Sequence, residues 1–245
     1  MTINVKGLNV NYVQYGKEDG LDVVLLHGWG QNILMMDPIG QGLKDLYHIT
    51  ILDFPGFGES DSLKDAYTIS DYYLLLDEFL NKLKIKKPIL VGHSFGGRVA
   101  IYYASKKPVE KLVLFGAPFV KRVSEPTTMM KVLKTLKKIP GIRSLAEYSK
   151  KYIGSRDYRA ASPVMRKTLV NIVNCDLTSN VRSIKCSTIA IAGENDTEVP
   201  LDEIMLYKEY IDDCEVIVYP NMTHYAYLED RVRTIRILRA FFGGK

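Results

Sequence analysis

The sequence predicts an α/β protein whose mostly parallel central sheet is flanked by helices and interrupted by one helical insertion. Three observations predict this class. Short apolar runs recur along the 245 residues, helical patterns lie between most of them, and the alternation fails once, for about seventy residues after position 120. Strands that alternate with helices pair in parallel through right-handed crossovers. The length suits one such domain with a substantial core.

The apolar runs differ in their periodicity. Residues 8–16 (LNVNYVQYG) alternate polar and apolar side chains, as an antiparallel strand with one wet face does. The later runs are continuously apolar, which is typical of central parallel strands covered on both faces. These runs are residues 22–28, 48–56, 88–94, 109–118, 186–196 and 214–224.

Helices are predicted between the strands from the spacing of apolar side chains. Residues 69–85 form an apolar stripe on one face, with Ser70 as the expected N-terminal cap. Residues 202–211 and 230–242 follow the same pattern. Each of these three segments is therefore expected to be one continuous helix.

The break in the alternation predicts the domain organisation. We expect a single domain with its core in residues 1–118 and 187–245 and an inserted lid at about 119–186, which proline and glycine divide into short helices. Residues 119–187 hold fifteen Lys or Arg against four Asp or Glu, whereas the whole chain has a net charge of +5. The lid is thus strongly basic and the rest of the chain mildly acidic.

Composition excludes several classes of protein. No run of eighteen apolar residues exists, so no membrane span is expected. The first residues lack the apolar region of a signal peptide, which favours a cytoplasmic location. Cys175, Cys186 and Cys214 show no C-x-x-C spacing, so neither a disulfide framework nor a zinc site is indicated. The chain has no G-x-G-x-x-G and no Walker A sequence, so nucleotide binding has no support.

Residues 88–100 (PILVGHSFGGRVA) contain the most informative motif. A buried strand is predicted to end at Ser94, and a helix from Gly97 to about Lys106 is predicted to follow. Residues 92–96 (GHSFG) fit G-x-S-x-G, the strained turn that exposes a nucleophilic serine. Residues two positions either side of the serine must be nearly hydrogen-sized to avoid a clash. The N–H of Phe95 and the helix dipole would stabilise an oxyanion beside the serine.

Three other segments complete this set. Residues 25–30 (LLHGWG) end a strand in a glycine-rich turn, where the N–H of Trp29 is the second expected oxyanion donor. Asp196 and His224 each follow a later apolar strand. A serine nucleophile needs a base to take its proton, and the base needs an acid that fixes its tautomer. Glu194 competes with Asp196 for the role of acid, but it lies deeper in its turn.

These motifs resemble those of the α/β-hydrolase superfamily over essentially the whole chain. The resemblance rests on residues 27–30 (HGWG), 53–60 (DFPGFGES), 92–97 (GHSFGG), 193–200 (GENDTEVP) and His224. It implies the α/β-hydrolase fold, a catalytic triad in the chain order Ser94, Asp196, His224, and a lid at the basic insertion. His27, His93 and Asp53 are expected to shape the surrounding loops.

The resemblance implies a serine hydrolase that cleaves carboxylic esters through an acyl-enzyme on Ser94, with no cofactor and no metal. Carbon–carbon bond hydrolases, thioesterases, acyltransferases and lyases use the same triad and stay open, as does a ligand receptor of this fold without catalysis. The serine disfavours the dehalogenases and epoxide hydrolases of the superfamily, because these carry aspartate at that position.

Two features concern the substrate. Met35, Met129, Met130 and Met165 predict an adaptable apolar acyl pocket, with ordinary core packing as the alternative. The basic lid predicts a docking surface for an acidic carrier or an anionic substrate, with a solvated surface as the alternative. Nucleic-acid binding is not expected, because aromatic and basic residues do not interleave.

Overall fold

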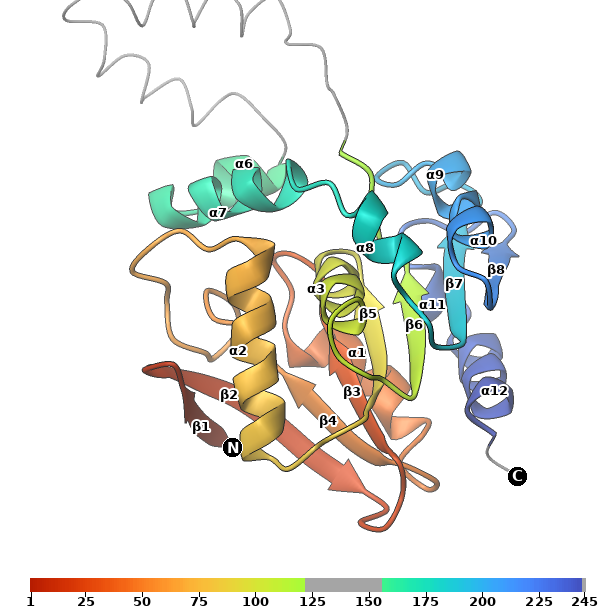
Figure 1. Ribbon diagram of the computed structural model, residues 1–245, viewed down its shortest axis with the longest axis horizontal. Coiled ribbons are helices and arrows are strands. Elements are labelled where there is room, and N and C mark those ends of the chain that lie inside the picture. Colours follow the sequence, from red (N-terminus) through yellow and green to blue (C-terminus); the bar gives the residue numbers. More distant parts are fainter. Residues whose placement is uncertain (122–155, 244–245) are drawn as a thin grey trace, which may run out of the picture.

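The apolar runs of the sequence form one sheet with the strand order β1-β2-β4-β3-β5-β6-β7-β8 (Figure 1). The computed structural model describes residues 1–121 and 156–243. Within these ranges the strands are β1 (Thr2–Val5), β2 (Leu8–Gly16), β3 (Asp22–Leu26), β4 (His48–Leu52), β5 (Ile89–His93), β6 (Lys111–Phe115), β7 (Thr188–Gly193) and β8 (Cys214–Tyr219). β2 pairs with β1 and β4 antiparallel, and the other neighbouring strands pair in parallel. The predicted α/β class is confirmed.

Helices cover both faces of the sheet, because successive side chains of a buried strand point to opposite faces. Val24 and Leu26 of β3 join a core cluster with α2 (Ile69–Lys82) and α3 (Phe95–Ala104). Val23 and Leu25 join a second cluster with α1 (Ile33–Gln41) and α12 (Arg231–Phe242). In Figure 1, α2 and α3 lie in front of the sheet and α1 lies behind it. None of the helices in the described ranges is long and apolar enough to cross a membrane.

Three details of the predicted helices were wrong. The cap of α2 is Thr68 and not Ser70, because Thr68 and Asp71 satisfy each other's backbone amides in a capping box. Residues 202–211 do not form one helix. They divide into α9 (Leu201–Met205) and α10 (Tyr207–Tyr210). The helix predicted from Gly97 begins two residues earlier, directly after Ser94.

The described part of the predicted lid lies across one end of the sheet, beyond α2 and α3 (Figure 1). It contains α6 (Arg156–Ala160), α7 (Pro163–Val173) and α8 (Thr178–Arg182). The chain leaves the core after β6 and re-enters it at β7. At this base the amide of Leu177 donates to the carbonyl of Phe119 over 2.9 Å.

A buried arginine joins the two ends of this segment to α3. Arg98 is 3% exposed, and its guanidinium donates to the carbonyls of Pro118 (2.9 Å), Ile172 (2.9 Å) and Cys175. Pro118 lies where the chain leaves the core, and the other two carbonyls lie where it returns. Because a buried charge is costly unless it is hydrogen-bonded, these contacts hold the base of the segment against the helix that follows Ser94.

Candidate active site

Ser94 lies alone between β5 and α3, in a turn with φ 49° and ψ −109°. A positive φ is strained for a residue with a side chain, and the fold holds it here through the bond from the Ser94 amide to the Phe115 carbonyl (2.9 Å). A Cβ at Gly92 would lie 2.6 Å from the Cα of Gly97, and one at Gly96 would lie 2.4 Å from the carbonyl oxygen of Leu26. The turn therefore admits only glycine at both positions.

Asp196 and His224 form a hydrogen-bonded pair at the ends of two neighbouring strands. Asp196 follows β7 and His224 follows β8, and 2.7 Å separates His224 Nδ1 from Asp196 Oδ2. The other carboxylate oxygen of Asp196 accepts the amides of Glu198 (2.8 Å) and Val199 (2.9 Å). The side chain of Asp196 is only 1% exposed and that of His224 10%. The pair is thus nearly sealed from solvent except on the imidazole side.

Burial acts to raise the pKa of the Asp196 carboxyl, but the hydrogen bonds from His224 and from the two amides outweigh burial and hold that pKa below its usual value. Asp196 is therefore ionised at neutral pH. A carboxylate that accepts from Nδ1 leaves Nε2 of the imidazole as the atom free to take a proton. Glu194 does not compete for this contact, because it is exposed and accepts the amide of Asn221 (2.9 Å).

The residues next to Ser94 connect it to this pair. His93 lies beside His224, with 4.7 Å between the two ring centroids. Gly116 follows Phe115, whose carbonyl holds the Ser94 amide, and a Cβ at Gly116 would lie 3.0 Å from His224 Nδ1 and 3.3 Å from Asp196 Oδ2. The fold thus brings the ends of β5, β6, β7 and β8 together at one edge of the sheet, with all three predicted catalytic residues at that edge.

The glycine-rich turn after β3 packs against the beginning of α3. A Cβ at Gly96 would collide with the carbonyl of His27 as well as that of Leu26, and the rings of Trp29 and Phe95 meet edge to face with 5.6 Å between centroids. In the part of the chain that the structure describes, neither the Trp29 amide nor the Phe95 amide donates to another residue. Two unused donors therefore lie in the turns on either side of this contact.

Comparison with known proteins agrees with this architecture. A family model described as "alpha/beta hydrolase fold" matches residues 23–140. A meta-cleavage product hydrolase from Pseudomonas fluorescens superposes with a TM-score of 0.77 at 22% identity, over 99% of this chain and 97% of the other. The chain belongs to the α/β-hydrolase superfamily.

Two similar proteins are named for their activities. The pimeloyl-[acyl-carrier protein] methyl ester esterase of Aeromonas salmonicida is 26% identical over 96% of this chain and all of its own. The 2-hydroxy-6-oxononadienedioate/2-hydroxy-6-oxononatrienedioate hydrolase 1 of Pseudomonas putida is also 26% identical, over 91% of this chain and 87% of its own. Both are hydrolases, and this chain is similar to both to the same degree.

Two buried residues hold the loops of this α/β-hydrolase site, as the sequence predicts. His27 Nε2 accepts the amide of Phe54 (3.0 Å), so its proton is on Nδ1, which donates to the carbonyl of Gly28 (2.7 Å). Burial lowers the pKa of His27 to about 4 and keeps it neutral. Asp53 accepts the amide of Ile33 (2.7 Å) at the first turn of α1 and the amide of Glu59 (2.9 Å).

The methionines predicted to line an acyl pocket separate into three groups. Met165 of α7 is 9% exposed and packs into the core cluster that contains Phe57 and Phe95, with its sulfur against Gly56. Met35 of α1 is half-buried and joins neither core cluster of the described residues. Met129 and Met130 lie outside the residues that the structure describes.

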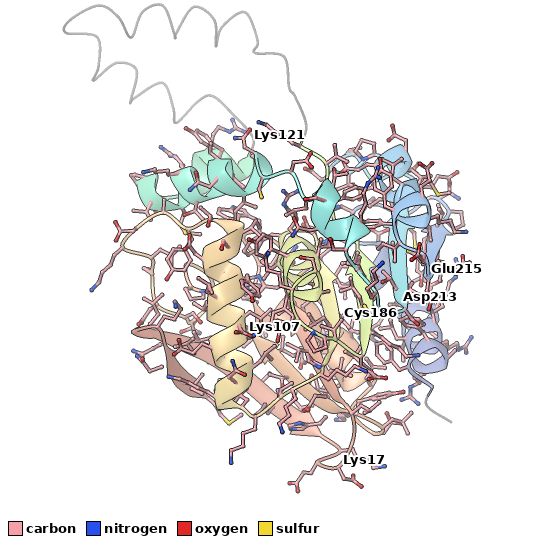
Figure 2. The ribbon with its side chains drawn as sticks, in the orientation of Figure 1. Lys17, Lys107, Lys121, Cys186, Asp213 and Glu215 are labelled. Atoms are coloured by element: carbon pink, nitrogen blue, oxygen red, sulfur yellow. The ribbon has the colours of Figure 1, made fainter. Side chains whose placement is uncertain are left out.

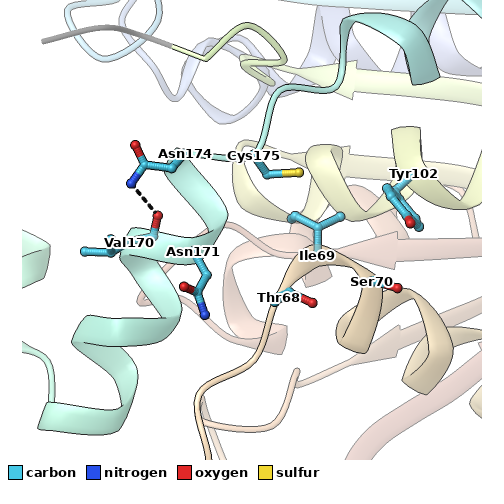
Figure 3. Close-up of a pocket in the computed structure, with 8 residues that line it drawn as sticks. All are labelled: Thr68, Ile69, Ser70, Tyr102, Val170, Asn171, Asn174 and Cys175. Carbon is cyan, nitrogen blue, oxygen red and sulfur yellow. Dashed lines mark hydrogen bonds between the residues drawn. The ribbon is translucent and has the colours of Figure 1, made fainter.

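A cavity of about 360 Å³ lies between the start of α2, Tyr102 of α3 and the last turn of α7 (Figure 3). Asn171 and Asn174 contribute polar side chains to it, but both amides donate to backbone carbonyls, of Tyr67 and Val170. None of the predicted catalytic or oxyanion residues lines this cavity. It is therefore separate from the edge of the sheet where Ser94 and His224 lie.

Sequence reasoning missed two residues that the structure brings to the site. The side-chain oxygen of Gln31 accepts the amide of Gly28 (3.0 Å) and lies 3.1 Å from His93 Nδ1. No local pattern marks a glutamine for this role. Arg98 has a usable signal, because a lone arginine in the otherwise apolar helix FGGRVAIYYA must find buried acceptors.

Proposed function

We propose that this protein is a serine hydrolase that cleaves carboxylic esters. His224 Nε2 takes the proton of Ser94 as its Oγ attacks the ester carbonyl, and the imidazolium then protonates the departing alcohol. Asp196 orients the imidazole and stabilises its charge. The amides of Trp29 and Phe95 bind the oxyanion of the tetrahedral intermediate. Water, deprotonated by His224, then releases the acid from Ser94.

The 2.7 Å contact of Asp196 with His224, on the edge of the sheet that carries the strained Ser94, is the single observation that supports this proposal most. A structural ion pair would not need the strained Ser94 at the same edge of the sheet. A buried acid–imidazole pair at the sheet edge that carries a serine held at positive φ is the arrangement with which α/β-hydrolases carry out acyl transfer. No step of the reaction requires a metal or cofactor.

The amides of Trp29 and Phe95 provide the electrostatic stabilisation of the oxyanion. A backbone donor aimed at a developing oxyanion contributes a factor of about 10² to 10³ in kcat, because it needs no reorganisation during the reaction. The Phe95 amide lies at the beginning of α3, whose dipole adds a partial positive charge there. The side chains of Trp29, Phe57, Phe95 and Met165 form an apolar wall beside these donors, which favours an ester with an apolar acyl group.

The segment at about 119–186 acts as the lid of this site in our proposal, on a core of residues 1–118 and 187–245. Two observations support it. Its described helices lie at the end of the sheet where Ser94 lies, and Met165 of α7 packs on the loop after β4. Arg98 anchors both ends of the segment to α3. A lid anchored in this way keeps its base fixed against the helix that follows Ser94.

The test is ester turnover by the purified protein. p-Nitrophenyl esters graded from acetate to decanoate are compared for the wild type, Ser94→Ala and Ser183→Ala. Ser183 is an exposed serine directly after α8, and its hydroxyl donates to the Ser179 carbonyl. We expect Ser94→Ala to lose at least about 10³-fold in kcat and Ser183→Ala to match the wild type. Equal rates for the wild type and Ser94→Ala would overturn the proposal.

The relative from Pseudomonas putida favours a second substrate class for the same three residues, the 2-hydroxy-6-oxo dienedioates after which that protein is named. Cleavage of such a substrate breaks a carbon–carbon bond and needs the same nucleophile or base. The same three residues can also cleave thioesters or transfer an acyl group to an acceptor other than water. A catalytically silent receptor would instead bind ligand stoichiometrically without product. Assays on a dienedioate and on an acyl thioester separate these alternatives from ester hydrolysis.

The positive charge of the lid favours a substrate that is attached to an acidic carrier protein. Lys121, Arg159 and Lys167 are exposed at this end of the molecule, where Figure 2 shows Lys121. Lys185 is exposed too, but it lies before β7 at the opposite edge of the sheet and pairs with Asp212 over 3.8 Å. The relative from Aeromonas salmonicida acts on an ester carried by acyl carrier protein. We expect Arg159→Glu with Lys167→Glu to leave p-nitrophenyl ester turnover unchanged and to raise KM at least tenfold for the methyl ester of a carrier-bound acid. An unchanged KM would exclude carrier docking at these residues.

A further inference from the structure

We propose that His93 is a positioning residue that ties the loop of His224 to the serine turn. This inference rests on the proposed function, because it assigns His93 a role in placing the base of that reaction.

His93 is completely buried and touches both loops. Its Nε2 lies 3.2 Å from the carbonyl oxygen of His224, and the two rings lie 4.7 Å apart. Its Nδ1 lies 3.1 Å from the side-chain oxygen of Gln31, which also accepts the amide of Gly28, the residue before Trp29. Peptide bonds join His93 directly to Ser94. One imidazole therefore contacts all three parts of the site.

The two oxygens next to the ring of His93 determine which of its nitrogens carries the proton. The ring lies between two oxygens that only accept hydrogen bonds, the His224 carbonyl and the Gln31 side-chain oxygen, and a neutral imidazole has one proton to donate. Gln31 already accepts the Gly28 amide, whereas no other described group donates to the His224 carbonyl, so we assign the proton to Nε2. Burial, reinforced by the nearby His224, lowers the pKa of His93 well below its usual value and keeps the ring neutral. A neutral ring beside the base avoids a second cation there when His224 takes the serine proton.

The geometric consequence concerns the backbone of the base. The carbonyl of His224 and its side chain share one Cα, so a donor that holds the carbonyl restricts the direction of the imidazole toward Ser94. The base loop is otherwise held mainly from β7, by the Asn195 amide on Met222 (2.8 Å) and by Asp196. His93 holds the base loop from the side of the serine turn. Misplacement of a catalytic group by about 1 Å costs about 10² in rate.

A packing role alone would predict a different dependence on the side chain. The ring of His93 also packs 4.8 Å from that of Tyr227, so any loss of volume would disturb this cluster. Phenylalanine keeps a ring of similar size without a donor. Glutamine keeps an N–H near the position of Nε2 without a ring. The two variants therefore separate the hydrogen bond from the packing.

The experiment measures kcat and KM on the best p-nitrophenyl ester for the wild type, His93→Phe, His93→Gln and His48→Phe. His48 is the control, a half-buried histidine at the other end of β4 that pairs with Asp22. We expect His93→Phe to lose about 10- to 100-fold in kcat with KM within about threefold. His93→Gln should recover most of that loss, and His48→Phe should match the wild type. In parallel, the rate at which a fluorophosphonate labels Ser94 should follow the same order.

Three results would overturn the role of His93. These are full kcat in His93→Phe, a loss in His93→Gln as large as that in His93→Phe, or nitrogen NMR of the wild type that places the His93 proton on Nδ1. The NMR measurement needs no variant to fold. If the wild type is labelled by fluorophosphonate but cleaves no ester, the proposal of ester hydrolysis is refuted. The labelling rates of the variants still test the positioning role of His93 in that case. If the wild type is not labelled at all, both proposals fail together.

Discussion

Replacing Asp196 by asparagine is the perturbation whose effect follows most directly from the structure. The carboxylate oxygen that accepts the Glu198 and Val199 amides becomes the amide oxygen, so both of these bonds survive. The other oxygen, 2.7 Å from His224 Nδ1, becomes an NH₂ group that can only donate. The imidazole must then present a lone pair on Nδ1 and carry its proton on Nε2.

An imidazole with its proton on Nε2 cannot take the proton of Ser94. A forced wrong tautomer of this kind lowers kcat by about 10⁴ in serine proteases, while the oxyanion donors retain their part. We expect a loss of about 10³ to 10⁴ in kcat here, which corresponds to about 4 to 5.5 kcal/mol of activation free energy at about 1.4 kcal/mol per factor of ten. KM should change little, because Asp196 is buried behind the imidazole.

The assay compares kcat and KM for Asp196→Asn and Glu194→Gln on the same p-nitrophenyl ester, with thermal unfolding as the check on folding. Glu194→Gln is the matched control, since a glutamine oxygen can still accept the Asn221 amide. It should stay within about threefold of the wild type. An Asp196→Asn variant with more than a tenth of the wild-type kcat, or equal losses in the two variants, would refute the assignment of the acid.

Two further predictions concern stability. The pKa of buried His27 is about 4 against about 6.5 in an unfolded chain, so the unfolded state binds more protons between these values and stability falls as pH falls. The wild type should therefore lose about 3 kcal/mol of unfolding free energy relative to His27→Gln between pH 7 and pH 4, as measured by urea titrations. A free-energy difference between the two proteins that stays constant with pH would contradict a neutral, buried His27. Gly96→Ala places a Cβ 2.4 Å from the Leu26 carbonyl and should cost at least about 2 kcal/mol in the same titrations. Gly7→Ala, with positive φ and open space around it, should cost only about 1 kcal/mol; equal costs would show that the turn relaxes around the added methyl group.

Local steric rules explain why so much of the serine turn could be predicted. The strained Ser94 and the glycines around it form a motif within a few residues, and their constraints are backbone contacts that any chain in this conformation meets. The continuous apolar runs likewise required burial on two faces, which placed them in the centre of a parallel sheet. The helix boundaries were less certain, because a cap such as Thr68 depends on one side chain two residues from the predicted one.

The sequence by itself therefore determined the α/β class, the position of the serine turn and the basic character of the insertion, since each depends on neighbouring residues or on composition. Only the tertiary structure decided which residues meet. The contact of Asp196 with His224 spans 28 positions, and that of Gln31 with His93 spans 62. Arg98 reaches carbonyls more than seventy positions away. Such pairs are set by strand order and by the crossing of loops at the sheet edge, where short-range propensity carries no information.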